Sequence, residues 1–219
     1  MIPPSLSLDT SLQVTDRYYR TRKPIMNMKI LFFGTIVSIA SLCAASAADT
    51  YKIDPAHSTV GFSVTHMVIN TVHGKFDSFS GFVVVDGKTI QSARGTMETK
   101  SVDTGVAMRD KDLRSPNFFD AEKYPEITFV SKGATQKDGE TVLTGEFTMH
   151  GVTKELSLPV KMTGPIQDPW GNTRIGLSAR TTLNRKDYGL NYSKTLEAGG
   201  LVVGNEIEIE INAEATKAK

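Results

Sequence analysis

The segment 141–164, TVLTGEFTMHGVTKELSLPVKMTG, alternates apolar and polar residues through two consecutive runs. The residues that share the apolar side are Leu143, Gly145, Phe147 and Met149 in the first run, and Leu156, Leu158, Val160 and Met162 in the second. A period of two is that of a half-buried β-strand. The His150-Gly151 pair between the runs supplies a glycine for the positive φ that a tight hairpin favours. We therefore predict an antiparallel hairpin whose apolar face needs a partner from elsewhere in the chain.

Further strands are indicated by the same alternation on both sides of this hairpin. A short strand from Asp49 ends at Pro55, which cannot donate a hydrogen bond to a ladder. The other predicted strands are 57–65, 79–86, 93–101, 127–131, 174–183 and 201–211. Residues 67–74 are ambiguous and could form one helical turn, and residues 212–219 are expected to fray. A total of about eight strands without βαβ spacing favours an all-β fold, either a closed antiparallel barrel or a sandwich.

One helix is predicted, over residues 104–114, with Asp103 or Thr104 as its N-cap. Ser115-Pro116 ends it. Its apolar residues, expected to pack inward, are Val106, Ala107, Met108 and Leu113.

The N-terminal 47 residues are typical of an export signal rather than of a folded domain. Lys29 precedes an apolar run, and the small residues Ala45-Ser46-Ala47 form a cleavage site, so we expect cleavage before Ala48 and a periplasmic protein. The 19 uncharged residues between Lys29 and Asp49 could alternatively remain as a membrane anchor. Translation could begin at Met1, Met26 or Met28. The chain thus divides into an extension and signal peptide, residues 1–47, and one domain, residues 48–219.

The charge balance and the cysteine content exclude two classes of function. Residues 48–219 carry a net charge of about −2 and no basic cluster, which argues against binding to nucleic acid. The single cysteine, Cys43, lies inside the predicted signal, so no disulfide or thiol chemistry is expected in the mature protein.

Several motifs resemble those of the YceI-like polyisoprenoid-binding family, a family of lipocalin-like periplasmic proteins. They are Ile53-Asp54 followed by His57-Ser58 and His66; Arg109 to Ser115 with Phe118-Phe119-Asp120 and Tyr124 to Phe129; Gly145 to Lys154; Asp168-Pro169-Trp170-Gly171; and Arg185 followed by Asp187-Tyr188-Gly189. Asp112 departs from the pattern, because many members carry His there. The resemblance covers residues 48–219 and implies an eight-stranded antiparallel, lipocalin-like barrel with the short helix near its mouth. It also implies a ligand, a long isoprenoid chain of the polyprenyl or quinone type.

The inward parity of the strands gives a set of candidate ligand-binding residues, although each alone could equally be core. They are Val60, Phe62, Val64, Met97, Phe129, Leu143, Phe147, Met149, Leu156, Leu158, Val160, Leu177 and Ile207, with Met108, Leu113, Phe118 and Phe119 near the mouth. Small inward residues, Gly145, Ala179 and Thr181, could leave an open tube along the barrel. They could equally fit against bulky neighbours, in which case the barrel is a filled structural or interaction domain without a ligand.

Arginines near the mouth are candidates for contact with a ligand head group. Arg109, Arg114 and Arg185 could each grip diphosphate or quinone oxygens, since a guanidinium presents a fork of donors. Arg185 could instead pair with Asp187 and fix the end of the barrel.

No metal site, cofactor or enzyme activity is expected. His57, His66, His73 and His150 do not share a ligand spacing. His57 with Asp54 and Ser58 is a candidate group for hydrolysis, but the chain has no nucleophile elbow. The expected partner is an isoprenoid or another long-chain amphiphile. Transient membrane contact and a dimer both stay open.

Overall fold

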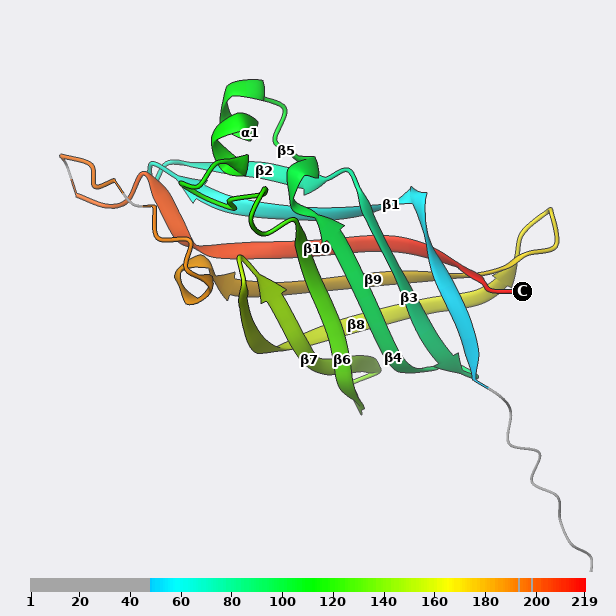
Figure 1. Cartoon of the computed structure of the whole chain (residues 1–219). Coiled ribbons are helices and arrows are strands. Elements are labelled where there is room, and N and C mark those ends of the chain that lie inside the picture. The colour runs from blue at the N-terminus through cyan, green and yellow to red at the C-terminus, as the bar shows by residue number, and fades with distance from the viewer. Residues whose placement is uncertain (1–47, 193, 198) are drawn as a thin grey trace, which may run out of the picture. The chain divides into compact units, whose positions relative to one another are not determined.

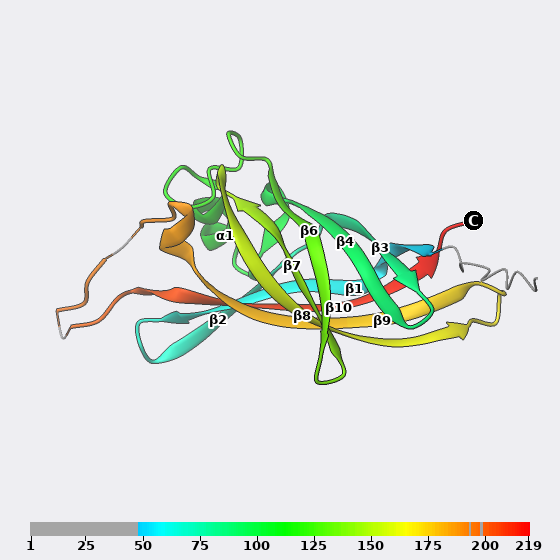
Figure 2. The ribbon, with the colours of Figure 1, turned by 90° about the horizontal axis from the view of Figure 1, so that it is seen from below.

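The computed structural model describes residues 48–192, 194–197 and 199–219. The predicted signal peptide, its cleavage site and the alternative starts lie almost wholly outside the described residues. Within the described part, eight antiparallel strands close into a barrel, and a short helix lies beside it (Figures 1 and 2). The predicted fold class is confirmed.

All the pairings between the described strands are antiparallel. In chain order, the described strands and helices are β1 (Asp49–His66), β2 (Asn70–Phe76), β3 (Phe79–Asp86), β4 (Thr89–Glu98), the 3₁₀ turn η1 (Thr99–Ser101), β5 (Val102–Asp103), α1 (Ala107–Arg114), β6 (Glu126–Lys137), β7 (Glu140–Met149), β8 (Val152–Gln167), β9 (Thr173–Asn184), η2 (Arg185–Tyr188) and β10 (Val203–Lys217).

The barrel closes through the pairing of β1 with β10, which runs from Tyr51↔Lys217 to His66↔Val203. Two predictions are wrong here. The first strand does not end at Pro55 but continues to His66, and the tail does not fray at residue 212 but stays in β10 to Lys217. The inward residues Ala213 and Ala215 are small, so the apolar alternation of β10 weakens in the sequence while its pairing continues.

Pro55 lies in a wide interruption of the β1–β10 ladder. Residues 55–58 of β1 face the single residue Ala213 of β10, because pairing passes from Asp54↔Glu214 to Thr59↔Asn212. Proline fits there because the interruption needs no ladder donor from it. The Ser58 hydroxyl donates to Asp54 O at 2.7 Å and accepts from Glu214 N at 3.0 Å, so it replaces lost ladder bonds.

Beyond this interruption β1 changes its neighbour on the other side. Residues 49–52 pair with β3, whereas residues 60–66 pair with β2 in a hairpin. The helical turn considered for residues 67–74 is therefore wrong: residues 67–69 form the hairpin turn and Asn70 begins β2. β2 also pairs with the two-residue strand β5, which leads to α1.

The helix α1 is shorter than predicted and presents a different face. It begins at Ala107, its N-cap is Val106 without a side-chain hydrogen bond, and Met108 is 86% exposed. The buried residue is Asp110, which accepts hydrogen bonds from Thr104 N and Oγ1. The Asp110 carboxylate is turned toward Thr104 and away from solvent. Met108 lies two residues earlier, on the opposite side of the helix, and therefore faces outward. No helix of the described segments is long and apolar enough to cross a bilayer.

The two ends of the barrel are built differently. One end of the barrel holds the start of β1, the end of β10 and the turns β3–β4, β6–β7 and β8–β9, and we call it the terminal end. We call the opposite end the α1 end. At the terminal end the interior is packed with side chains that are at most 3% exposed: Tyr51, Val85, Ile90, Leu143, Ile175 and Ala215. This end of the interior is therefore filled.

An ion-pair network around Arg174 ties together the strands at the terminal end. Its guanidinium donates from Nη1 to Asp54 and Glu214, at 2.8 and 3.2 Å, and from Nε to Asp168 at 2.8 Å. These bonds connect β9 with β1, β10 and the β8–β9 turn. The hydrogen bond from Arg174, with a second from His57, lowers the pKa of Asp54 from 3.8 to about 2. Burial alone would raise the pKa of Asp168, but hydrogen bonds from Arg174 and Asn172 hold it below its ordinary value.

We predict that acid weakens the fold through this network. Because the pKa of Asp54 is lower in the fold than its ordinary 3.8, its contribution is complete above that value and is lost as pH falls toward about 2. Arg174→Met should therefore reduce the free energy of unfolding at neutral pH and flatten its dependence on pH between about 5 and 2. Urea unfolding followed by circular dichroism across this range measures both effects.

The matched control is Lys88→Met, which removes an exposed cation from the β3–β4 turn at the same end of the barrel. It should leave the pH dependence unchanged. An identical acid-induced loss of stability in the Arg174→Met variant and the parent would contradict the assignment.

Candidate ligand-binding site

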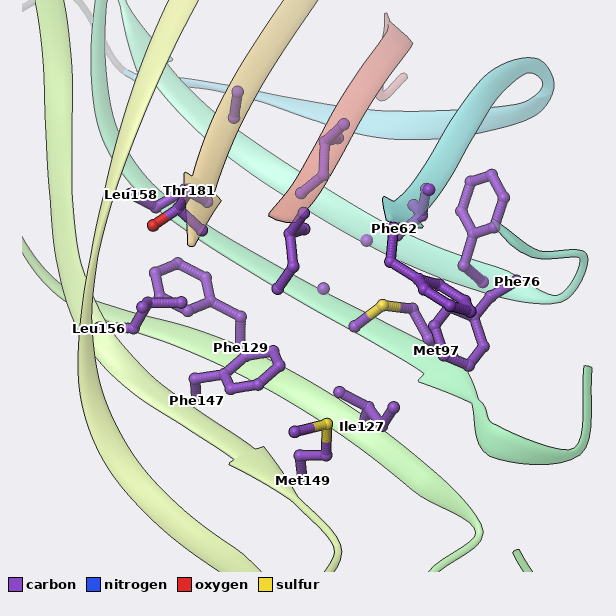
Figure 3. A pocket seen from close by; sticks show the side chains of 18 of the residues that line it. Phe62, Phe76, Met97, Ile127, Phe129, Phe147, Met149, Leu156, Leu158 and Thr181 are labelled. Atoms are coloured by element: carbon purple, nitrogen blue, oxygen red, sulfur yellow. The ribbon is translucent and has the colours of Figure 1, made fainter. Parts of the chain in front are cut away.

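A cavity of about 220 Å³ lies inside the barrel, between the packed terminal end and α1. Its lining is almost entirely apolar and comes from both halves of the sheet. Figure 3 shows aromatic, methionine and aliphatic side chains from several strands around a common space. The barrel is therefore packed at one end and hollow in the middle.

The structure places most of the residues predicted from the inward parity around this cavity. All the predicted apolar residues line the cavity except Met108, which α1 turns toward solvent. Those that do are Val60, Phe62, Val64, Met97, Leu113, Phe118, Phe119, Phe129, Leu143, Phe147, Met149, Leu156, Leu158, Val160, Leu177 and Ile207. Residues that were not among the candidates also line it, including Ile53, Phe76, Ile127, Leu190, Ile209 and Ile211. The alternation of β10 already contained the signal for Ile209 and Ile211, whereas Phe76 belongs to a strand that the sequence did not reveal.

Aromatic rings line the α1 end of the cavity in a connected row. The Phe62 and Phe76 ring centroids are 5.8 Å apart, and Phe76 meets the ring of Phe119 edge-on at 6.0 Å. Phe62 comes from β1, Phe76 from β2, and Phe119 from the segment after α1. These contacts are favourable aromatic geometries. They fasten the β1–β2 hairpin and the helical segment to the same wall of the cavity.

The small inward residues have different roles. Ala179 and Thr181 of β9 line the cavity, as an open tube requires. Gly145 does not, and its assignment to the tube is wrong. A Cβ on Gly145 would overlap the backbone of Val130 and Ser131. The ladder between β6 and β7 shifts register beside Ser131, so glycine lets the two backbones approach there.

Of the three arginines considered for a head group, only Arg185 lines the cavity. Arg109, a residue of α1, donates to the hydroxyl and the carbonyl of Thr104, at 2.7 and 2.8 Å. Arg114 donates to the carbonyls of Lys100 and Val102 at 2.7 and 2.6 Å. Arg114 therefore fixes α1 to the segment η1–β5, and Arg109 fixes it to Thr104, the residue that follows β5.

Arg185 is 3% exposed and is bound by oxygens of the segment that follows it. It donates to the carbonyls of Leu190, Val203 and Gly204, and to Asn205 Oδ1. Burial lowers its pKa from the ordinary value. The considered ion pair with Asp187 is wrong, because the Asp187 carboxylate lies 3.7 Å from the Lys154 ammonium instead. Arg185 therefore closes the loop between η2 and β10 and leaves a buried positive charge at the cavity wall.

The histidine group considered for hydrolysis lies away from the cavity lining. His57 Nδ1 is 2.9 Å from Asp54 Oδ2, but the Ser58 hydroxyl is bound to the backbone at Asp54 and Glu214. Donor atoms of Asp54, His57 and Glu214 all lie within 4.8 Å of one another, a spacing that could hold a cation. Both carboxylates are already paired with Arg174, so the group is accounted for as part of the ion-pair network.

A closed antiparallel barrel with an apolar internal cavity belongs structurally with the small barrels that enclose a ligand. The chain matches the YceI-like domain over residues 51–215 and belongs to that family. It is 42% identical over 158 residues to a UPF0312 protein of a Shewanella species, covering 70% of this chain and 82% of that protein. It is also 33% identical over 198 residues to the Protein YceI of Salmonella newport, covering 89% of this chain and all of that protein.

Solved structures share the fold. Burkholderia cenocepacia BcnA superposes with a TM-score of 0.66 at 23% identity, over 75% of this chain and 99% of that one. The Campylobacter jejuni YceI protein gives 0.61 at 28% identity, over 76% and 96%. A domain of Saccharophagus degradans described as polyisoprenoid-binding gives 0.58 at 19% identity, over 77% and 98%.

We predict that Arg185 is a major contributor to stability. Arg185→Met removes a buried cation and leaves carbonyls without donors, which should lower the free energy of unfolding by about 3 kcal/mol. Arg185→Lys should recover part of this loss, because one ammonium cannot reach all the oxygens. Chemical denaturation measures the differences.

Arg180→Met is the control on the neighbouring strand. Its side chain is 63% exposed and pairs with Glu208 and Glu210 at the surface, so its loss should change stability little. Equal effects of the Arg185 and Arg180 substitutions would contradict the role assigned to Arg185.

Proposed function

We propose that this protein binds one long-chain isoprenoid lipid, of the polyprenyl or quinone type, in the barrel cavity. It acts as a carrier or storage protein in the periplasm, to which the N-terminal signal would direct it. The observation that carries the proposal is the apolar cavity of about 220 Å³ inside the barrel. Membership of the YceI-like family and the likeness to a polyisoprenoid-binding domain give additional support.

The energetics favour an apolar chain over a polar ligand. Each buried methylene contributes about 0.8 kcal/mol, so ten to twenty of them supply roughly 8 to 16 kcal/mol. Association costs about 4 to 15 kcal/mol. A long tail can therefore bind without a strong polar anchor. The methionines Met97 and Met149 in the lining suit a flexible chain, because thioethers adapt to irregular contours.

A head group would lie near Arg185 rather than near the other two arginines. Arg185 is the candidate that lines the cavity, and Leu190 and Val203, two residues whose carbonyls it binds, line it as well. Most of its N–H groups are already used, so it offers a positive charge more than a free fork of donors. This favours a quinone or an alcohol over a diphosphate, which demands several direct donors.

Two rival functions make different demands on the same cavity. A structural barrel without a ligand would be filled by its own side chains, and the volume inside this one argues against it. A lipid-modifying enzyme would place reactive groups on the lining. The group His57, Asp54 and Ser58 is not part of the lining, so this group could not act on a lipid in the cavity.

Native mass spectrometry of the protein, purified after expression of the full chain in a bacterium, tests the proposal directly. We expect a stoichiometric excess mass that organic extraction releases as an isoprenoid. An empty barrel that takes up neither ubiquinone nor a polyprenol from detergent would refute lipid carriage. Conversion of an added isoprenoid diphosphate would favour the enzymatic rival.

We predict that Ala179→Phe blocks lipid uptake while the barrel still folds. Ala179 is an inward residue of β9 in the cavity wall, so a phenyl group there would occupy the space of the chain. Loss of several methylene contacts should weaken binding at least about 100-fold. Fluorescence or mass titration with ubiquinone in detergent measures the change.

Thr182→Phe is the matched control, because Thr182 lies on the same strand with an exposed, outward side chain. It should bind like the parent. Unchanged uptake by a folded Ala179→Phe variant would show that the cavity is not the ligand site.

A further inference from the structure

The turn between β1 and β2 exposes three consecutive apolar side chains. Met67, Val68 and Ile69 are 41%, 63% and 87% exposed, and we call these three residues the tip. The hairpin projects from the α1 end, beside the loop between η2 and β10 (Figures 1 and 2). Contiguous exposed apolar residues of this kind mark surfaces that meet another apolar phase.

The backbone of the tip is strained, because residues with positive φ there are neither glycine nor asparagine. Met67 and Val68 both have positive φ, 51° and 64°. For a β-branched residue such as Val68 this is an outlier. Hairpin turns with positive φ at consecutive positions favour Asn-Gly. The chain therefore keeps apolar side chains where turn stability alone would select polar or glycine residues, which points to a use for those side chains.

The charge pattern of the hairpin suits entry into a lipid surface. The sequence from Pro55 to Gly74 contains no Asp, Glu, Lys or Arg. Two backbone N–H groups of the tip are already satisfied, because Met67 N donates to Val202 O at 2.8 Å and Ile69 N donates to His66 O at 3.3 Å. Inserting the tip into lipid would therefore bury no charged side chain of this stretch, and these two N–H groups would keep their hydrogen bonds when they lose water.

The tip continues the apolar surface of the cavity. Val64 of β1 lies three residues before the tip and lines the cavity. Ile207 of β10, which pairs with Val64, lines it as well. Val203, which pairs with His66 next to the tip, lines it too. The cavity lining thus extends to within one ladder pair of the tip, at the end opposite the ion-pair network.

We propose that the tip docks this protein on a lipid bilayer by shallow insertion of Met67, Val68 and Ile69, so that the cavity exchanges its lipid with the membrane at that contact. The inference rests on the proposed lipid-binding function. A second copy of the protein fits the tip less well than a bilayer does. Three side chains would bury much less surface than the ~800 Å² per partner of a stable protein–protein interface. Since residues 55–74 contain no Asp, Glu, Lys or Arg, docking at neutral pH should be insensitive to salt.

The test combines a tip substitution with two sources of lipid. The triple variant Met67→Asn, Val68→Gly, Ile69→Ser gives the turn residues that its geometry favours, so its melting temperature should equal or exceed that of the parent. Flotation with vesicles of phosphatidylethanolamine and phosphatidylglycerol should show at least tenfold weaker association of the variant, at low and high salt alike. Uptake of ubiquinone from such vesicles should slow by a similar factor, whereas uptake from detergent should stay unchanged.

The matched control is Ile166→Ser with Trp170→Ser, which removes two side chains that are 64% and 81% exposed at the terminal end. It should float and exchange lipid like the parent. Equal vesicle association of the parent and the tip variant would overturn the proposal. A tip variant that loses only self-association would assign the tip to a second copy instead. Failure of the parent to take up lipid even from detergent would refute the proposed function separately.

Discussion

The pairing of β1 with β10 is the constraint on which the rest of the structure depends. An open sheet of this length would expose two strand edges and could not enclose an interior. Closure requires β10 to reach Lys217, although its last inward residues are alanines that add little apolar surface. The ladder tolerates the interruption at Pro55 because Ser58 supplies hydrogen bonds to both strands. Toward Lys217, backbone pairing and the ion pairs of Arg174 hold this seam, whereas toward the α1 end apolar pairs such as Val60↔Ile211 and Phe62↔Ile209 face the interior.

The interruption also determines the asymmetry of the barrel. Before it β1 pairs with β3, and beyond it β1 pairs with β2, so the hairpin can project past the α1 end. At the terminal end Tyr51 and Ile175 fill the interior, and Arg174 connects the strands around them. Filling one end gives the cavity a closed base. Ligand exchange is consequently expected at the other end, where the wall is made of shorter elements and aromatic contacts.

The sequence predicted the parts of the fold and cavity that depend on alternation, and it failed where backbone geometry or polar contacts decide. Phe147, Leu158 and Leu177 could be placed on the wall because period two assigns a face to each residue of a regular strand. Met108 could not, since a helix of eight residues turns according to its buried carboxylate Asp110. The prediction that Gly145 widens the cavity failed because parity gives only the face on which a glycine lies. It does not show whether the space beside the glycine is empty or, as here, taken by the backbone of a neighbouring strand. The strand β2 was missed because its short run of Thr, Val, His and Gly gives little apolar signal.

A cavity that binds through apolar contact alone poses a kinetic problem, because the lipid must leave one apolar phase and enter another without crossing much water. Each methylene exposed on the way costs about as much as its burial contributes, about 0.8 kcal/mol. Continuous apolar surface from the membrane to the lining removes most of that cost. The β1–β2 hairpin can provide such a surface, because it carries Val64 of the lining, pairs with Val203 through His66, and has no Asp, Glu, Lys or Arg at its turn. The strained turn fits this role, because it lowers the local stability of the hairpin but places apolar side chains where the lipid would pass between the membrane and the cavity.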